Sequence, residues 1–69
     1  MDEIIFLVEE SPEGGYTARA LGVSIFTEAD TYEELKEAVK DAVHCHYDYE
    51  LMRPKIIRLH YIKEEVIAA

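Results

Sequence analysis

The chain has 69 residues, enough for one domain, and a net charge of −8 from 15 acidic and 7 basic residues. This excess of carboxylates repels nucleic acid phosphates, so we expect no direct nucleic acid binding. No apolar run approaches the roughly 18 residues of a membrane span, and the acidic N-terminus lacks a signal-peptide pattern. One cysteine excludes an internal disulfide. We therefore expect a single cytoplasmic domain over residues 1–69, without a membrane partner.

Residues 3–9, EIIFLVE, predict a β-strand that is apolar on both faces. One face would carry Ile4, Phe6 and Val8, and the other Ile5 and Leu7. A strand of this kind is central in its sheet, or another molecule covers its second face.

A turn follows at residues 11–15, where proline presets φ and two glycines can take positive φ. Residues 16–21 predict the return strand. Gly22 then interrupts the chain before a third strand at residues 23–28. Because the connections are short, these three strands predict an antiparallel meander.

Thr31 is the predicted N-cap of a helix that runs to about Tyr49. Its hydroxyl can accept from the amide of Glu34, whose side chain reaches back, as in a capping box. An apolar face follows at helical spacing, formed by Tyr32, Leu35, Val39, Ala42, Val43 and His46. Charged and polar residues occupy the opposite face, namely Glu37, Lys40, Asp41, His44 and Asp48. Pro54 prevents any further helix.

A last strand is predicted at residues 55–63, and residues 64–69 would either extend it or form a short helix. The element order is therefore β-β-β-α-β, which predicts an α+β fold. A right-handed crossover places the last strand parallel to the first and beside it. The predicted sheet order is 3-2-1-4, with the helix on one face.

One helix covers one face of such a sheet and leaves the other face open. Candidates for this open face are Ile5, Leu7 and Phe26, or the residues that alternate with them along the strands. Exposed apolar patches usually mark protein interfaces, so we expect a homodimer or a higher oligomer.

His44, Cys45 and His46 form a cluster of potential metal ligands in sequence. On a helix they point about 100° apart, and zinc needs four ligands, or three and a water. We therefore predict no metal site. His46 falls in the apolar face and is expected to be a core or interface residue, whereas His44 would be solvated and Cys45 would pack at the helix edge.

No arrangement of residues typical of catalysis is present. The acids of the first strand lie at its ends, those of the helix form a charged face, and the glycine pair belongs to a turn. We expect no enzyme activity, no catalytic residue and no cofactor. Tyr47, Tyr49, Tyr61 and Met52 are expected to cluster near the helix end and the last strand, either as an interface or as ordinary packing.

The run from residue 9 to residue 38 resembles the core of the HicB-like antitoxin family. Two stretches carry the resemblance: the turn Glu13, Gly14, Gly15 and Tyr16, followed by Leu21 and Gly22, and the helix start Asp30, Thr31, Glu33, Glu34 and Leu35. Ala29 departs from the pattern, because relatives usually carry glycine there. The resemblance covers about residues 3–65 and implies a partial ribonuclease H-like core.

The resemblance also implies a function. In that family the acidic domain binds a small basic RNA-cleaving toxin of HicA type and blocks its active surface. Many members append a C-terminal DNA-binding domain. We do not expect one here, because the sequence stops after the last predicted strand, and so we expect no direct operator contact. The alternative is an oligomeric domain with a regulatory or small-ligand role and no toxin partner.

Overall fold

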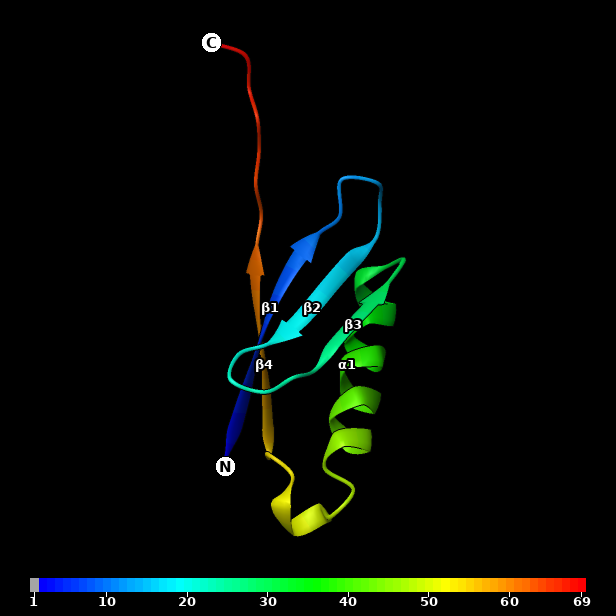
Figure 1. Cartoon of the computed structure of the whole chain (residues 1–69). Coiled ribbons are helices and arrows are strands. Elements are labelled where there is room, and N and C mark those ends of the chain that lie inside the picture. The colour runs from blue at the N-terminus through cyan, green and yellow to red at the C-terminus, as the bar shows by residue number, and fades with distance from the viewer. Residues whose placement is uncertain (1) are drawn as a thin grey trace.

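The computed structural model describes residues 2–69 and has the expected α+β fold (Figure 1). Its elements are β1 (Glu3–Glu10), β2 (Tyr16–Ala20), β3 (Phe26–Ala29), α1 (Tyr32–His46), the 3-10 turn η1 (Glu50–Met52) and β4 (Ile56–Ile62). The strands form one sheet in the order β3-β2-β1-β4, which confirms the predicted topology.

β1 is a central strand, as its two apolar faces predicted. It pairs antiparallel with β2 on one side and parallel with β4 on the other. The parallel register runs from the pair Glu3 and Ile56 to the pair Glu9 and Ile62. The connection from β3 to β4 passes through α1, which runs antiparallel to both of these strands. β4 therefore points in the same direction as β3 and β1.

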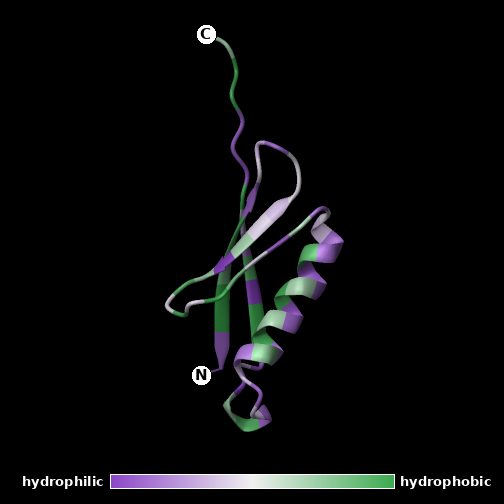
Figure 2. Cartoon of the chain, turned by 45° about the vertical axis from the view of Figure 1, so that its right-hand side comes forward, coloured by the Kyte–Doolittle hydropathy of each residue, from purple (hydrophilic) through white to green (hydrophobic). Residues whose placement is uncertain are grey.

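The hydrophobic core lies between the sheet and α1. Figure 2 shows green and purple alternating along α1, whereas β1 is green over most of its length. The helix contributes Leu35, Val39 and Val43, all buried, and the sheet contributes the buried face of β1 at Phe6 and Val8. α1 packs mainly against β3 and β2, so it is displaced toward that side of the sheet.

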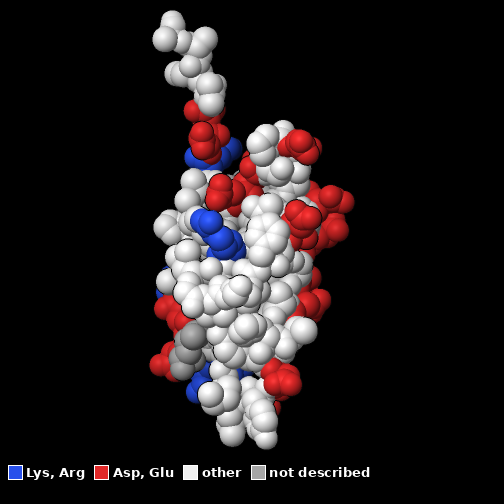
Figure 3. Space-filling model, viewed as in Figure 1, with Lys and Arg blue, Asp and Glu red and all other residues white. Residues whose placement is uncertain are grey.

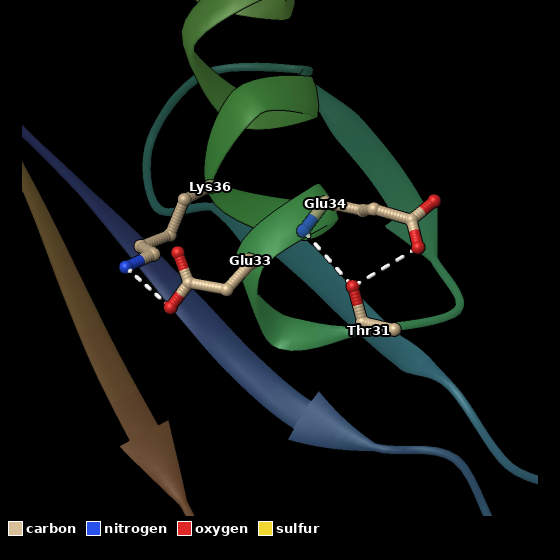
Figure 4. Close-up of polar contacts among 4 residues, drawn as sticks. All are labelled: Thr31, Glu33, Glu34 and Lys36. Carbon is tan, nitrogen blue, oxygen red and sulfur yellow. Dashed lines mark hydrogen bonds and ion pairs between the residues drawn. The ribbon is translucent and has the colours of Figure 1, made fainter.

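The start of α1 confirms the predicted N-cap (Figure 4). Thr31 Oγ1 accepts a hydrogen bond from the backbone amide of Glu34 at 3.1 Å. The same hydroxyl donates to Glu34 Oε1 at 3.0 Å, so the carboxylate is fixed by the capping side chain. Glu33 lies in the same turn and forms an ion pair with Lys36 at 2.9 Å. Acidic residues here also interact favourably with the positive end of the helix dipole.

The turn between β1 and β2 depends on its glycines, as predicted. Gly14 and Gly15 both have positive φ, at 101° and 83°. At Gly15 a Cβ atom would lie only 2.9 Å from the carbonyl oxygen of Ala29. The hairpin can therefore approach the end of β3 closely only because this position has no side chain.

Two predicted boundaries were wrong. α1 ends at His46 instead of Tyr49, because Tyr47 leaves the helical conformation and Arg53 Nε donates to its carbonyl at 3.2 Å. Since a side chain now satisfies this carbonyl, no further helical turn is needed. β3 begins at Phe26 instead of residue 23, because Ile25 bonds back to the carbonyl of Val23 in a tight local turn.

Residues 64–69 form neither the strand extension nor the helix considered from sequence. They leave the end of β4 without regular structure and run away from the body of the molecule (Figure 1). Within residues 2–69 there is no helix long and apolar enough to cross a membrane.

Replacing the capping hydroxyl tests its contribution to the fold. We expect Thr31→Ala to lower the free energy of unfolding by about 1 kcal/mol, because the amide of Glu34 loses its acceptor. Thr31→Ser keeps the hydroxyl and should retain most of the wild-type stability. Urea denaturation followed by circular dichroism at one fixed protein concentration measures both; equal stability of the Ala and Ser variants would contradict the assigned cap.

Candidate functional site

A hollow on the described surface lies between the β1-β2 turn and the start of α1. It has a volume of about 650 Å³. The residues that line it are Ser11, Glu13, Gly14, Gly15, Tyr16, Thr17, Glu28, Ala29, Asp30, Glu34 and Ala38. We call this the acidic hollow, because its lining includes four carboxylates and no lysine, arginine or histidine.

Two stretches that are separate in sequence meet at the acidic hollow. The register of β2 against β3 pairs Tyr16 with Ala29, which brings the turn beside the residues that enter α1. The absent side chain at Gly15 allows the close approach described above. The motif from Glu13 to Tyr16 and the helix-start residues Asp30 and Glu34 therefore form one surface.

The carboxylates make the acidic hollow a site for positive charge. Figure 3 shows acidic groups gathered near the end of the hairpin and along the adjoining side of the molecule. Glu34 is held by the Thr31 hydroxyl, so one carboxylate has a fixed position. A surface of one charge sign attracts partners of the opposite sign and speeds their encounter. The chemistry of this hollow suits a basic partner.

The face of the sheet opposite α1 is open, and it carries the residues expected there. Ile5 and Leu7 are half-buried, and Phe26 is 63% exposed. The registers place Leu7, Arg19, Phe26 and His60 in one row across the four strands. Figure 3 shows a broad uncharged area in the middle of the molecule on the sheet side. We call this the open sheet face.

The predicted aromatic cluster was wrong in one member. Tyr61 does not join Tyr47 and Tyr49 but packs with Tyr16 and Tyr32, at centroid distances of 6.0 and 5.7 Å. Tyr16 and Tyr32 are themselves 5.8 Å apart. The reason is the parallel pairing of β4, which carries Tyr61 to the level of Val8, far from the end of α1.

This cluster of Tyr16, Tyr32 and Tyr61 changes the acidity of one phenol. Partial burial raises the pKa of Tyr61 above its ordinary value, because it disfavours the phenolate. The nearby Glu10 carboxylate and the Tyr16 hydroxyl raise the pKa further. Tyr61 Oη donates to Glu10 Oε1 at 3.4 Å, an exposed and long hydrogen bond.

The His44-Cys45-His46 cluster differs from the prediction at His46, which is exposed and not a core residue. The last turn of α1 lies over the loop before β3, where Cys45 and His46 border a shallow hollow with Ser24 and Ile25. The His46 ring contacts the ring of its neighbour Tyr47 in an edge-on arrangement, at 4.8 Å between centroids. Cys45 and His44 are also exposed. Within residues 2–69, no group of three or more His, Cys, Asp or Glu side chains is placed to hold a metal.

Comparison with known proteins places the chain in a family. It is 64% identical over 56 residues to a UPF0150 protein of Archaeoglobus fulgidus, covering 81% of this chain and 82% of that protein. It is 46% identical over 66 residues to a UPF0150 protein of Thermotoga maritima, covering 96% and 91%. The chain belongs to the UPF0150 family. No family model matches it, and no solved structure matches it.

The raised pKa of Tyr61 can be measured by following phenolate absorbance as the pH rises. We expect the difference between wild type and Tyr61→Phe to titrate with a midpoint above 10, and Glu10→Gln to lower that midpoint. Because the folded-state pKa exceeds the unfolded value of about 10, the stabilising contribution is complete below pH 10 and lost above it. A midpoint at or below 10 would show that the phenol is fully solvated.

Proposed function

We propose that this chain is an antitoxin-type binding module of the HicB kind, which occludes a small basic RNA-cleaving toxin. The proposal rests on one observation. The two stretches that carry the HicB resemblance, the turn at residues 13–16 and the helix start at residues 30–35, come together at the acidic hollow. A shared surface explains why both stretches would be needed for one partner.

The proposed mechanism is steric and electrostatic, and this chain performs no chemical step. A protein that cleaves RNA must bind phosphates, so its active surface carries lysine and arginine. The carboxylates of Glu13, Glu28, Asp30 and Glu34 would compete with RNA for these cations. The complex would form where the toxin meets RNA, in the cytoplasm.

The open sheet face has a different role in the proposal, because it exposes the apolar side chain of Phe26 next to the half-buried Leu7 and Ile5. We assign it to self-association, in which Phe26, Leu7 and Ile5 of two copies cover one another. Burying such residues stabilises an assembly by about 1.5–3 kcal/mol for each fully buried side chain. A domain of 69 residues gains a useful stability margin from this.

Capture of the partner tests the toxin assignment. The full chain is used to isolate interacting proteins from its native host, and a captured basic protein is then assayed for RNA cleavage with and without added chain. We expect cleavage to be inhibited in proportion to complex formation. Capture of no basic protein, or of one whose cleavage activity is unaffected, would refute the proposal.

Charge reversal locates the binding surface. Glu13→Lys with Glu28→Lys removes two carboxylates of the acidic hollow and should weaken the complex about tenfold or more. The control is Glu37→Lys with Asp41→Lys, which changes the net charge equally on the exposed outer face of α1. Calorimetry on both variants distinguishes the hollow from a general charge effect; equal weakening would argue against the hollow.

Light scattering tests the role of the open sheet face. We expect a particle of at least two chains of 8.0 kDa each at micromolar concentration. Phe26→Asp should shift the mass toward one chain, because a carboxylate cannot be buried unpaired in an apolar interface. Leu51→Asp is the matched control, since Leu51 is 93% exposed and lies in η1, away from the sheet. A wild-type monomer would refute the assignment.

A further inference from the structure

A second hollow, of about 380 Å³, lies on the helix side of the sheet, between α1 and β4. It exists because α1 packs over β3 and β2, which leaves the inner side of β4 incompletely covered. Its apolar lining is Val39 from the helix, Pro54, and Ile57 and Leu59 from β4. Ile57 and Leu59 are half-buried, so the groove has an apolar floor that is open to solvent.

The walls of this groove are basic, and we call it the lysine groove. Lys36, Lys40 and Lys55 line it together with His44, although the chain as a whole carries a net charge of −8. Figure 4 shows Lys36 and Glu34 pointing to different sides of α1, and these two residues line the lysine groove and the acidic hollow respectively. Lys36 pairs with Glu33, but neither Lys40 nor Lys55 forms an ion pair with any residue in 2–69.

The groove runs beside a free sheet edge. β4 is the last strand in the order β3-β2-β1-β4, and within the described chain it pairs only with β1. An unpaired edge presents backbone donors and acceptors that an extended segment can use by adding as a further strand. A segment bound here would need acidic side chains for the lysines and apolar side chains for the floor.

Residues 64–69 have this composition. Their sequence, EEVIAA, places two glutamates before two β-branched residues, and Val66 and Ile67 are 88% and 84% exposed. Side chains alternate along an extended strand. Glu64 therefore shares a side with Val66, and Glu65 shares the other side with Ile67. In either register the segment presents one acid and one apolar residue to the groove.

We propose that residues 64–69 of one copy of this chain bind the lysine groove of a second copy, as a strand added to the free edge of β4. In one register Glu64 would supply a partner for Lys40 or Lys55 and Val66 would cover the apolar floor; in the other register Glu65 and Ile67 would do so. The segment continues from the end of β4, whereas Pro54 and Lys55 of the groove lie at the start of β4 (Figures 1 and 2). To reach its own groove the segment would have to turn back along β4. The groove of a second copy can accept the segment without such a turn.

Cross-linking between copies, combined with charge-reversed variants, tests this contact. Carbodiimide cross-linking of a mixture of light and isotopically heavy chains is read by mass spectrometry. In the wild type we expect mixed light-heavy links that join Glu64 or Glu65 to Lys40 or Lys55. The groove variant Lys40→Glu with Lys55→Glu, and the segment variant Glu64→Lys with Glu65→Lys, should each lose these links when alone. Mixing the two variants should restore them.

Lys63→Glu is the matched control, because Lys63 lies outside the groove, and it should keep the wild-type links. Links only within one chain, or no recovery in the mixture of reversed variants, would overturn the proposal. A second readout is solution affinity: a peptide of residues 63–69 should bind the full-length segment variant about tenfold more tightly than the doubly substituted groove variant. Equal affinities would overturn the proposal as well.

These outcomes are independent of the toxin and of the open sheet face. Residue-specific links between the segment and the groove would appear whether or not a basic partner exists. Phe26→Asp, which tests the open sheet face, should leave the affinity of the peptide for the groove unchanged. Failure of one proposal is therefore distinguishable from failure of the other.

Discussion

The parallel pairing of β1 with β4 is the constraint on which the rest of this molecule depends. It makes β1 a central strand, so that Ile4, Phe6 and Val8 can be fully buried under one short helix. It also carries the end of β4 to the level of the helix start, where Tyr61 meets Tyr16 and Tyr32. Parallel strands need a crossover, and α1 with η1 supplies it.

The ratio of one helix to four strands decides which surfaces remain available. Because α1 packs over β3 and β2, the opposite face of the sheet is left open and the inner side of β4 is only partly covered. The same feature therefore produces the open sheet face and the lysine groove. Both surfaces expose apolar residues, and none of the elements described within residues 2–69 covers them.

The distribution of charge distinguishes the surfaces from one another. The acidic hollow gathers carboxylates on one side of α1, and the lysine groove gathers three of the chain's bases on the other side. A net charge of −8 gives no hint of this separation, since it sums over the whole surface. Two oppositely charged sites on one small domain can bind partners of different chemistry at once.

The sequence by itself determined the elements and their order. The continuous apolar run of β1, the glycine turn and the Thr31 cap are local signals, so their physics acts within a few residues and could be read without coordinates. The open sheet face was also predictable, because the number of elements fixes how many faces a helix can cover. The sheet order followed from the handedness of the crossover.

Only the tertiary structure decided which distant residues meet. The acidic hollow requires the pairing of Tyr16 with Ala29 and the close approach at Gly15, neither of which has a local signature. The exposure of His46 depends on where the helix ends relative to the sheet, and the position of Tyr61 depends on the strand register. The lysine groove depends on the sideways displacement of α1, which packing of the whole core sets and no periodicity in the sequence encodes.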